Sequence, residues 1–349
     1  RVGLPRAMSL EEGRRHILRH AEVASAWPNA VMGGNTTGAL GDWPDVAAAE
    51  YGNHQWALST LRIEDGQQVG PTDLSQVTVA VLDTGVAYED FDEDGVHYVR
   101  HPAFSGTTFV DPYDAIQLDD HANDDHRHGT HVAGVIAAQG GKTVGAAPGV
   151  KIMPVKVLDS EMIGTELSLA EGILHATASG ANIINMSLSF GLGYFPSALL
   201  QEAIAIAKAE GVILVASTGN SGALGVGYPA AFPEVLAVGA TRLSVDGADV
   251  EDLHAHYSSW GFQVDLLAPG GMMEGDLDGD GQPDGILAPA FPPGQPHLPE
   301  YWYYAGTSQA APHIAAMAAD LTADGVAPEL VGPTLKQAGN AGCTVETRL

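Results

Sequence analysis

The chain has 349 residues, 45% of them hydrophobic, so it can bury one large core. It carries 43 acidic residues against 15 Lys and Arg, which gives a formal net charge of -28 at pH 7. Nucleic acid and anionic membrane surfaces should repel such a chain, so neither is an expected partner. The acidic, lysine-poor composition fits either a protein adapted to high salt or an ordinary acidic exported protein.

Neither the cysteine content nor the hydropathy of the chain argues against export from the cell. Cys343 is the only cysteine, so no disulfide can form within the chain. No apolar run reaches the roughly 18 residues needed to span a bilayer. The sequence starts at Arg1 without a charged and apolar leader, and we therefore expect a processed or trimmed form.

The first 50 residues differ in pattern from the rest. Ser9 and Glu12 form a capping box ahead of a helical stretch that runs to about Ala26. We interpret residues 1–50 as an N-terminal extension or propeptide remnant, and residues 51–349 as one catalytic domain.

From Val77 onward, short β-branched runs alternate with segments of helical periodicity. This alternation predicts a doubly wound α/β fold, with a mostly parallel central sheet and helices on both faces. Functional sites of such folds gather at the carboxyl ends of the strands. Residues 270–300 are rich in Gly, Pro and Asp and are expected to form a long inserted loop. The expected strands are 77–82, 150–157, 182–188, 212–217, 235–240 and 264–268, and the expected helices are 131–138, 166–179, 197–210 and 307–323.

Three segments place a reactive side chain at a strand end or a helix start. Asp83 ends an apolar strand, His128 begins an apolar helix, and Ser308 lies in the first turn of an Ala-rich helix. The unpaired amides and positive end of that last helix favour a developing oxyanion beside Ser308. Each residue taken singly is more often a turn former or a cap, so only the three together indicate a catalytic site.

In this chain order, the three segments resemble the signature motifs of the subtilisin-like serine proteases, the subtilases. The resemblance runs from about Tyr51 to Lys336. The motif residues are Asp83-Thr84-Gly85, His128-Gly129-Thr130-His131-Val132-Ala133-Gly134 and Gly306-Thr307-Ser308-Gln309-Ala310-Ala311-Pro312-His313.

The resemblance implies a secreted serine endopeptidase that acts on proteins or peptides and has its own propeptide as a further partner. Ser308 would be the nucleophile, His128 the general base, and Asp83 the residue that orients the imidazole. Asn220 matches the side-chain donor of the oxyanion hole, which acts together with the Ser308 amide. His131 and His313 match positions that are usually structural in the family.

The resemblance also implies a cleft for an extended peptide, with preference for apolar or aromatic residues before the scissile bond. One wall would be an edge strand that pairs with the substrate main chain. A second segment would form the opposite wall of the pocket, and Gly227 would lie near the pocket floor. Ser189 replaces the usual glycine and leaves the pocket width open. The edge strand is Ser187, Leu188 and Ser189, and the opposite wall is Ala216, Ser217, Thr218 and Gly219.

Two other positions depart from the family pattern. Gln309 stands where relatives usually have Met. Ala103 replaces an Asp ligand of the usual tight calcium site, and the loop 139–144 is short. We therefore expect that particular calcium site to be absent.

An acidic run in the expected inserted loop predicts calcium as a structural cofactor, while no organic cofactor is expected. Its Asp residues fall at positions 1, 3, 5 and 9 of an EF-hand-like loop, and Gln282 could offer its backbone carbonyl at position 7. Leu287 at position 12 replaces the usual Glu, which predicts weaker affinity. A solvated acidic turn is the alternative. The predicted ligands are Asp276, Asp278, Asp280, Gln282 and Asp284, with a weaker second run at Asp90, Asp92 and Asp94.

Three other functions fit parts of the sequence. His126, His128 and His131 have a spacing that could bind zinc, but Thr130 stands where an acidic partner is expected. An aspartic protease built on Asp83 would need a second such loop or a symmetric dimer, and the sequence has no second Asp-Thr-Gly. An inactive binding protein would leave the three motifs unexplained.

Overall fold

The computed structural model describes residues 31–34, 55–61, 73–93, 95–246 and 249–342. The helix expected between Ser9 and Ala26 lies outside these ranges. In the described ranges, no helix is both long and apolar enough to cross a membrane.

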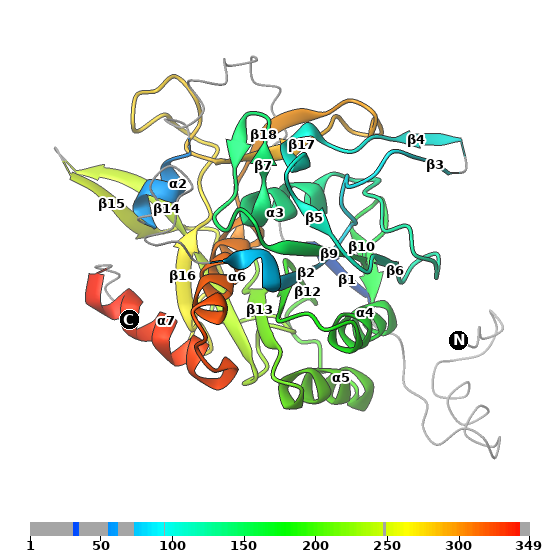
Figure 1. Ribbon diagram of the computed structural model, residues 1–349. Helices are drawn as coiled ribbons and strands as arrows, with labels where there is room; N and C mark the ends of the chain where they lie inside the picture. Colours follow the sequence, from blue (N-terminus) through cyan, green and yellow to red (C-terminus); the bar gives the residue numbers. More distant parts are fainter. Residues whose placement is uncertain (1–30, 35–54, 62–72, 94, 247–248, 343–349) are drawn as a thin grey trace.

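Nine strands of the described chain form one central sheet (Figure 1). Their order is β15-β14-β13-β11-β2-β9-β5, with β16 on β14 and β6 on β9. All pairs are parallel except the β14 and β15 hairpin. The strands are β2 Thr78–Asp83, β5 Thr108–Phe109, β6 Tyr113–Asp114, β9 Lys151–Lys156, β11 Ile183–Met186, β13 Ile213–Ser217, β14 Val235–Asp246, β15 Asp249–His254 and β16 Leu266–Pro269.

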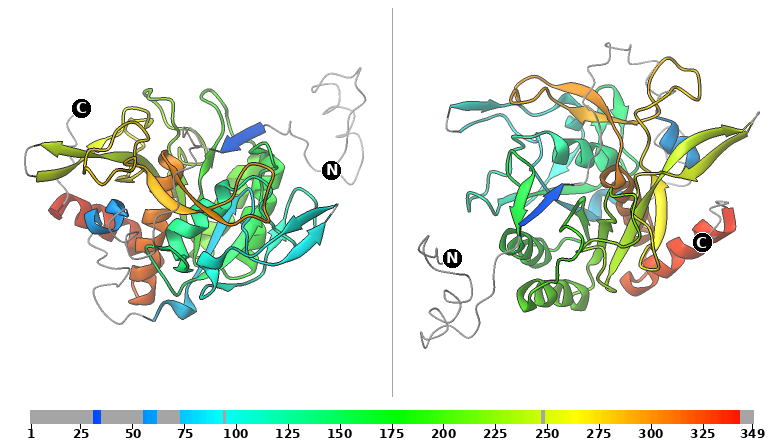
Figure 2. Two further views of the ribbon diagram at one scale, coloured as in Figure 1. Left: turned by 90° about the horizontal axis from the view of Figure 1, so that it is seen from above. Right: turned by 180° about the vertical axis from the view of Figure 1, so that it is seen from behind.

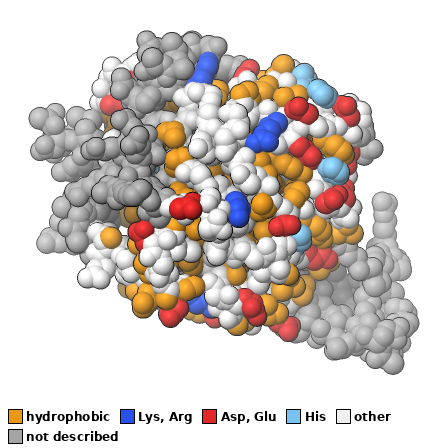
Figure 3. Space-filling view, viewed as in Figure 1, with side chains coloured by type: hydrophobic (Ala, Val, Ile, Leu, Met, Phe, Trp, Pro, Cys, Tyr) orange, Lys and Arg blue, Asp and Glu red, His pale blue; other side chains and the backbone are white. Residues whose placement is uncertain are grey.

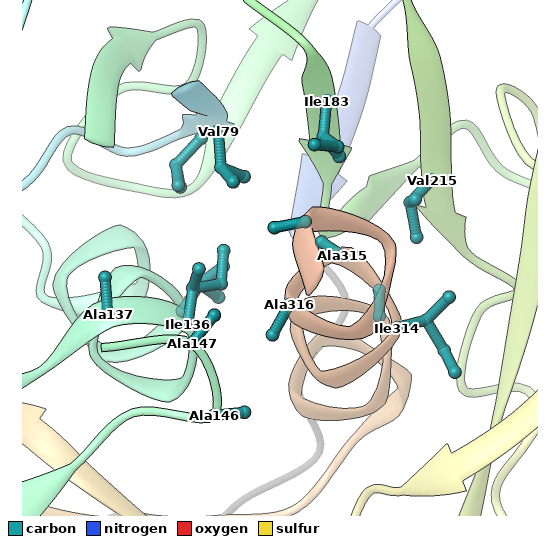
Figure 4. Packing of buried hydrophobic residues seen from close by; sticks show 14 of the residues in the cluster. Val79, Ile136, Ala137, Ala146, Ala147, Ile183, Val215, Ile314, Ala315 and Ala316 are labelled. Carbon is teal, nitrogen blue, oxygen red and sulfur yellow. The ribbon is translucent and has the colours of Figure 1, made fainter. Parts of the chain in front are cut away.

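Helices cover both faces of the sheet, which confirms the doubly wound α/β fold. Val79 and Val81 of β2 pack with α3 and α6, whereas Ala80 and Leu82 belong to the cluster with α4 and α5. Figure 4 shows Val79 beside residues of α3 and α6. Because both faces are covered, the central strands are continuous apolar runs without alternation. The helices are α3 His128–Ala137, α4 Glu166–Ala178, α5 Ala198–Ala209, α6 Thr307–Ala323 and α7 Pro328–Gly342.

The interpretation of residues 270–300 as a long loop is wrong in part. This stretch contains β17 Ile286–Ala290, which pairs antiparallel with β18 Glu300–Tyr304. The hairpin lies over α3 so closely that a Cβ atom at Gly134 would collide with the Pro289 ring. Burial of the apolar Ile286–Ala290 run against the helix explains why it forms a strand.

Other elements also differ from the sequence expectation, including β14, which runs to Asp246 and not to residue 240. α3 begins at His128 and not at His131, and α7 was not expected. The expected strand 182–188 stops at Met186, and the next residues leave the central sheet as β12 Leu188–Ser189. The remaining short elements are α2 Trp56–Thr60, η3 Leu74–Gln76, η4 Pro102–Phe104, β3 Phe91–Glu93, β4 Val96–Tyr98, β7 Gln139–Gly140 and β8 Thr143–Val144.

A separate three-stranded antiparallel sheet contains part of the N-terminal extension (Figure 2). Its middle strand is β1 Val31–Gly34, which lies between β12 and β10 Ile163–Thr165. In the register, Met32 opposes Gly164 and Gly34 opposes Leu188. Residues far apart in sequence therefore meet beside the carboxyl end of β11.

Candidate active site

Asp83 and His128 form a buried pair at the carboxyl end of β2. The Asp83 side chain is the last of the strand, and its Oδ1 accepts hydrogen bonds from His128 Nδ1 at 2.7 Å and from the Thr84 amide at 2.8 Å. Both side chains are fully shielded from solvent. A carboxylate at Nδ1 fixes the tautomer that leaves Nε2 as the proton acceptor. His128 Nε2 is buried without a hydrogen-bond partner.

The close approach of α3 to β2 depends on a glycine. His128 is the first residue of α3, and Gly129 follows it. A Cβ atom at Gly129 would collide with the Gly85 carbonyl and would lie 3.0 Å from Asp83 Cβ. The His-Gly sequence therefore allows the helix start to contact the strand end.

Ser308 lies in the first turn of α6, where free amides and the helix dipole favour negative charge. Its hydroxyl donates to the Ser187 carbonyl at 3.0 Å, and the Ser187 hydroxyl donates to the Ser308 carbonyl at 2.8 Å. This reciprocal pair joins the start of α6 to the end of β11. α6 packs beside α3 (Figure 4). Ser308 and His128 therefore belong to the first turns of two neighbouring helices.

The Asn220 side chain is oriented by the same turn of α6. Its Oδ1 accepts hydrogen bonds from the Thr307 amide and the Thr307 hydroxyl, both at 2.9 Å. The Nδ2 atom is buried and has no hydrogen-bond partner. An amide held by its oxygen, with its N–H groups unused, suits the stabilisation of an oxyanion.

The comparisons with known proteins agree with this geometry. The sequence pattern of the subtilase family matches residues 75–338. The chain belongs to the subtilase family. A thermophilic serine proteinase from Bacillus sp. (strain AK1) is 34% identical over 251 residues, which cover 71% of this chain and 52% of that protein. Subtilisin BL from Lederbergia lenta is 33% identical over 269 residues, covering 76% of this chain and 82% of the relative.

Solved structures have the same fold. A cold-adapted subtilisin-like serine proteinase superposes with a TM-score of 0.58 and 29% identity, covering 78% of this chain and 86% of that one. A protease from Pseudoalteromonas arctica gives a TM-score of 0.62 with 27% identity, covering 82% and 90% of the two chains. The chain spans only 52% to 58% of the length of several curated relatives. It is a subtilase with an α/β fold.

The expected substrate residues of this subtilase meet around Ser189. A Cβ atom at Gly227 would lie 3.1 Å from Ser189 Cβ, and one at Gly219 would lie 3.8 Å from Ser189 Oγ. The Gly227 amide donates to the Thr218 carbonyl at 3.3 Å, which joins the two glycine segments. The Ser189 side chain therefore occupies space between the two glycines. Ala216 and Ser217 are fully buried at the end of β13, behind these residues.

The strand β1 lies on the edge that was expected to bind substrate. Gly33 and Gly34 pair with Ser189 and Leu188 of β12, and Met32 is only 3% exposed. Met32 belongs to the same apolar cluster as Leu188. On its other side β1 pairs with β10, a strand that was not expected from the sequence because its three residues show no strand periodicity.

Three of the predicted calcium ligands lie together. Asp276, Asp278 and Asp284 each offer one carboxylate oxygen, and these oxygens lie within 4.8 Å of one another. Burial, followed by neighbouring negative charge, raises the pKa of Asp278 and Asp284. Asp280 is not in this group, and its Oδ1 accepts from the Gln282 amide at 2.8 Å. The full predicted set, with Asp280 and the Gln282 carbonyl, stays a prediction.

The second acidic run is described only at Asp90 and Asp92. Among the described residues, the carboxylates that group closely enough to hold a metal ion are those of Asp276, Asp278 and Asp284. Asp90 accepts a hydrogen bond from the Arg100 amide at 2.9 Å, and Asp92 pairs with His97 at 2.7 Å. Asp94 lies outside the described residues. Asp90 and Asp92 have these partners, and a metal site that also includes Asp94 stays a prediction.

His126, His128 and His131, the three expected zinc ligands, do not form a metal-binding group; no histidine group of that kind is found among the described residues. His131 Nε2 donates to the carbonyls of Ile286 and Trp302, and its ring stacks on Tyr304. Burial lowers the pKa of His131 to about 3, so the ring is neutral at ordinary pH. Its role is structural.

Proposed function

We propose that this chain is a secreted serine endopeptidase that cleaves proteins or peptides through an acyl-enzyme, with Asp83, His128 and Ser308 as its triad. The observation that supports this most strongly is the Asp83 carboxylate on His128 Nδ1, with His128 Nε2 buried and unpartnered. An imidazole held in this way is a general base without a proton donor, and the first turn of α6 supplies a hydroxyl.

In the proposed reaction, the Ser308 hydroxyl turns from the Ser187 carbonyl to His128 Nε2. Its oxygen attacks the substrate carbonyl while His128 takes the proton, and Asp83 stabilises the resulting imidazolium. The Ser308 amide and Asn220 Nδ2 stabilise the oxyanion. His128 then protonates the leaving amine, and water repeats the sequence on the acyl-enzyme.

For the substrate, we propose an extended peptide that pairs with β12 on one side and β10 on the other. Main-chain pairing of this kind tolerates many side chains, which supports broad specificity. The pocket residues Ala216, Ser217, Thr218, Gly219 and Gly227 carry no charge, so apolar residues are preferred before the scissile bond. The Ser189 side chain limits the width of that pocket.

The proposal extends to the N-terminal extension, residues 1–50, as a propeptide. Its strand β1 makes the antiparallel pairs that a bound substrate would make. The buried Met32 side chain anchors it in the cleft. A segment bound in this way competes with substrate until it is removed.

We also propose that calcium binds at Asp276, Asp278 and Asp284. Three carboxylates this close repel one another, and a divalent cation removes the repulsion. The acidic segment precedes β18 and α6, so an ordered loop would brace the chain that leads to Ser308.

The triad is tested by Ser308→Ala and His128→Ala, assayed on casein. Each variant should lose nearly all activity, because triad residues act as a unit and removal of the nucleophile costs several orders of magnitude. Wild-type enzyme should also be inactivated by a serine-directed phosphonate. A Ser308→Ala variant that keeps more than about a tenth of wild-type turnover would falsify the assignment.

A further inference from the structure

Asp124 is a fully buried carboxylate whose two oxygens both accept several hydrogen bonds. Oδ1 accepts from the Thr84 hydroxyl at 2.8 Å and from the amides of His126 at 2.9 Å and Arg127 at 2.7 Å. Oδ2 accepts from the Thr130 amide at 2.8 Å and the Thr130 hydroxyl at 2.6 Å. These donors surround His128 in sequence and include the residue that follows Asp83.

Thr84 connects this carboxylate to both members of the buried pair. Its amide donates to Asp83 Oδ1 at 2.8 Å, and its hydroxyl accepts from the Gly129 amide at 2.9 Å. Because the hydroxyl proton is directed to Asp124, the oxygen lone pairs face Gly129, the neighbour of His128. From the other side, the buried Lys156 ammonium donates to the Thr84 carbonyl at 2.7 Å.

The turn before α3 needs this support. Arg127, immediately before His128, has a φ of 101°, a left-handed conformation that is unfavourable for a residue with a side chain, and it provides no side-chain cap to the helix. Asp124 supplies the acceptors for the first amides of the turn. Its carboxylate therefore sets where the helix, and His128 with it, begins.

We propose that Asp124 is a positioning residue for the Asp83 and His128 pair, acting through Thr84 and the first turn of α3. The proposal rests on the proposed triad. It requires a carboxylate specifically, since each oxygen accepts from at least one backbone N–H, which cannot reverse its direction. An asparagine must turn its own NH2 group toward one of those N–H donors.

The experiment compares four variants in steady-state kinetics, with the number of competent sites counted by titration with a serine-directed reagent. Asp124→Asn should lower kcat per titrated site by about 10- to 100-fold with KM nearly unchanged, because a misplacement of about 1 Å can cost that much. Thr84→Val should lower kcat in the same way. Thr84→Ser, which keeps the hydroxyl, should restore it to near the wild-type value.

The matched control is Asp114→Asn. Asp114 is also buried and accepts from two backbone amides, of Ile116 and Gln117, but both bonds fall on Oδ1. It should keep wild-type kcat per site.

The inference is overturned if Asp124→Asn and Thr84→Val keep wild-type kcat per site, or if they change KM alone. It is also overturned if they reduce only the number of titrated sites, as a purely structural defect would. If Asp124→Asn does not fold, the contrast between Thr84→Val and Thr84→Ser decides. An inactive wild type, or an active Ser308→Ala variant, would instead contradict the proposed function.

Discussion

Gln309, the residue after the proposed nucleophile, is a buried polar residue whose side chain makes no hydrogen bond. The Gln309 side chain has no exposed surface, and neither its amide oxygen nor its amide nitrogen has a partner. A buried polar group without a partner costs about 1–3 kcal/mol. A Met side chain, which the resemblance to subtilases leads us to expect here, would avoid that cost but can be oxidised to a polar sulfoxide.

We predict that Gln309→Met stabilises the fold but makes the enzyme sensitive to peroxide. In a Ser308→Ala background, which avoids self-digestion, urea unfolding should show a gain of about 1–3 kcal/mol. In the active background, peroxide should inactivate Gln309→Met faster than wild type. Gln309→Leu is the control, because it should gain stability without the added sensitivity. Equal inactivation rates for wild type and Gln309→Met would refute the role of the thioether.

At the scale of elements, the carboxylates of the acidic segment before β17 accept hydrogen bonds from backbone amides of the same segment. The Gly281 amide donates to Asp276 at 3.0 Å, and the Leu277 amide donates to Asp284 Oδ2 at 3.0 Å. Asp278 completes the group of three carboxylates, while Asp280 turns to Gln282. The structure thus separates two residues that the sequence treats as equivalent.

We predict that Asp278→Ala abolishes the response of this loop to calcium and that Asp280→Ala does not. Calcium should raise the melting temperature of the wild type and of Asp280→Ala, because a ligand that binds only the folded state stabilises it, by about 2.7 kcal/mol at a hundred times its Kd. Melting curves with calcium and with chelator measure the effect. The site is wrong if Asp278→Ala responds as the wild type does, or if the wild type does not respond.

At the scale of the whole molecule, acidic residues far outnumber basic ones, 43 against 15. Figure 3 shows Asp and Glu side chains scattered over the visible face, with few Lys or Arg among them. Among the described residues, Lys156 pairs with Asp125, and Lys336 pairs with Asp265. A large excess of negative charge keeps copies of a protein apart through mutual repulsion.

Strand β1 lies on β12 at the edge of the proposed cleft, and this predicts delayed activity in the intact chain. Met32→Asp would place a charge in the apolar cluster that holds β1, and burial of an unpaired charge is strongly unfavourable. The variant should therefore show a higher initial rate and a shorter lag on a small chromogenic peptide. Met32→Leu, which keeps an apolar side chain, should retain the wild-type lag. Identical progress curves for the two variants would count against the propeptide.

The sequence by itself determined the fold class, the family and the identity of the candidate triad. Asp83, His128 and Ser308 lie in local motifs, and a continuous apolar run such as β2 predicts a strand covered on both faces. These features depend on residues that are close in the chain. The same local reasoning placed α6 at the bounds that the structure has.

Only the tertiary structure decided the features that depend on distant residues. The β17 and β18 hairpin packs over α3, and folding brings Asp284 together with Asp276 and Asp278 at the proposed calcium site. Strand β1 lies between β10 and β12, and the Thr84 hydroxyl donates a hydrogen bond to Asp124. Neither contact could be predicted from the sequences of the segments that it joins. Hydrogen bonds and burial between such segments exist only once the chain has folded, so no local pattern could predict them.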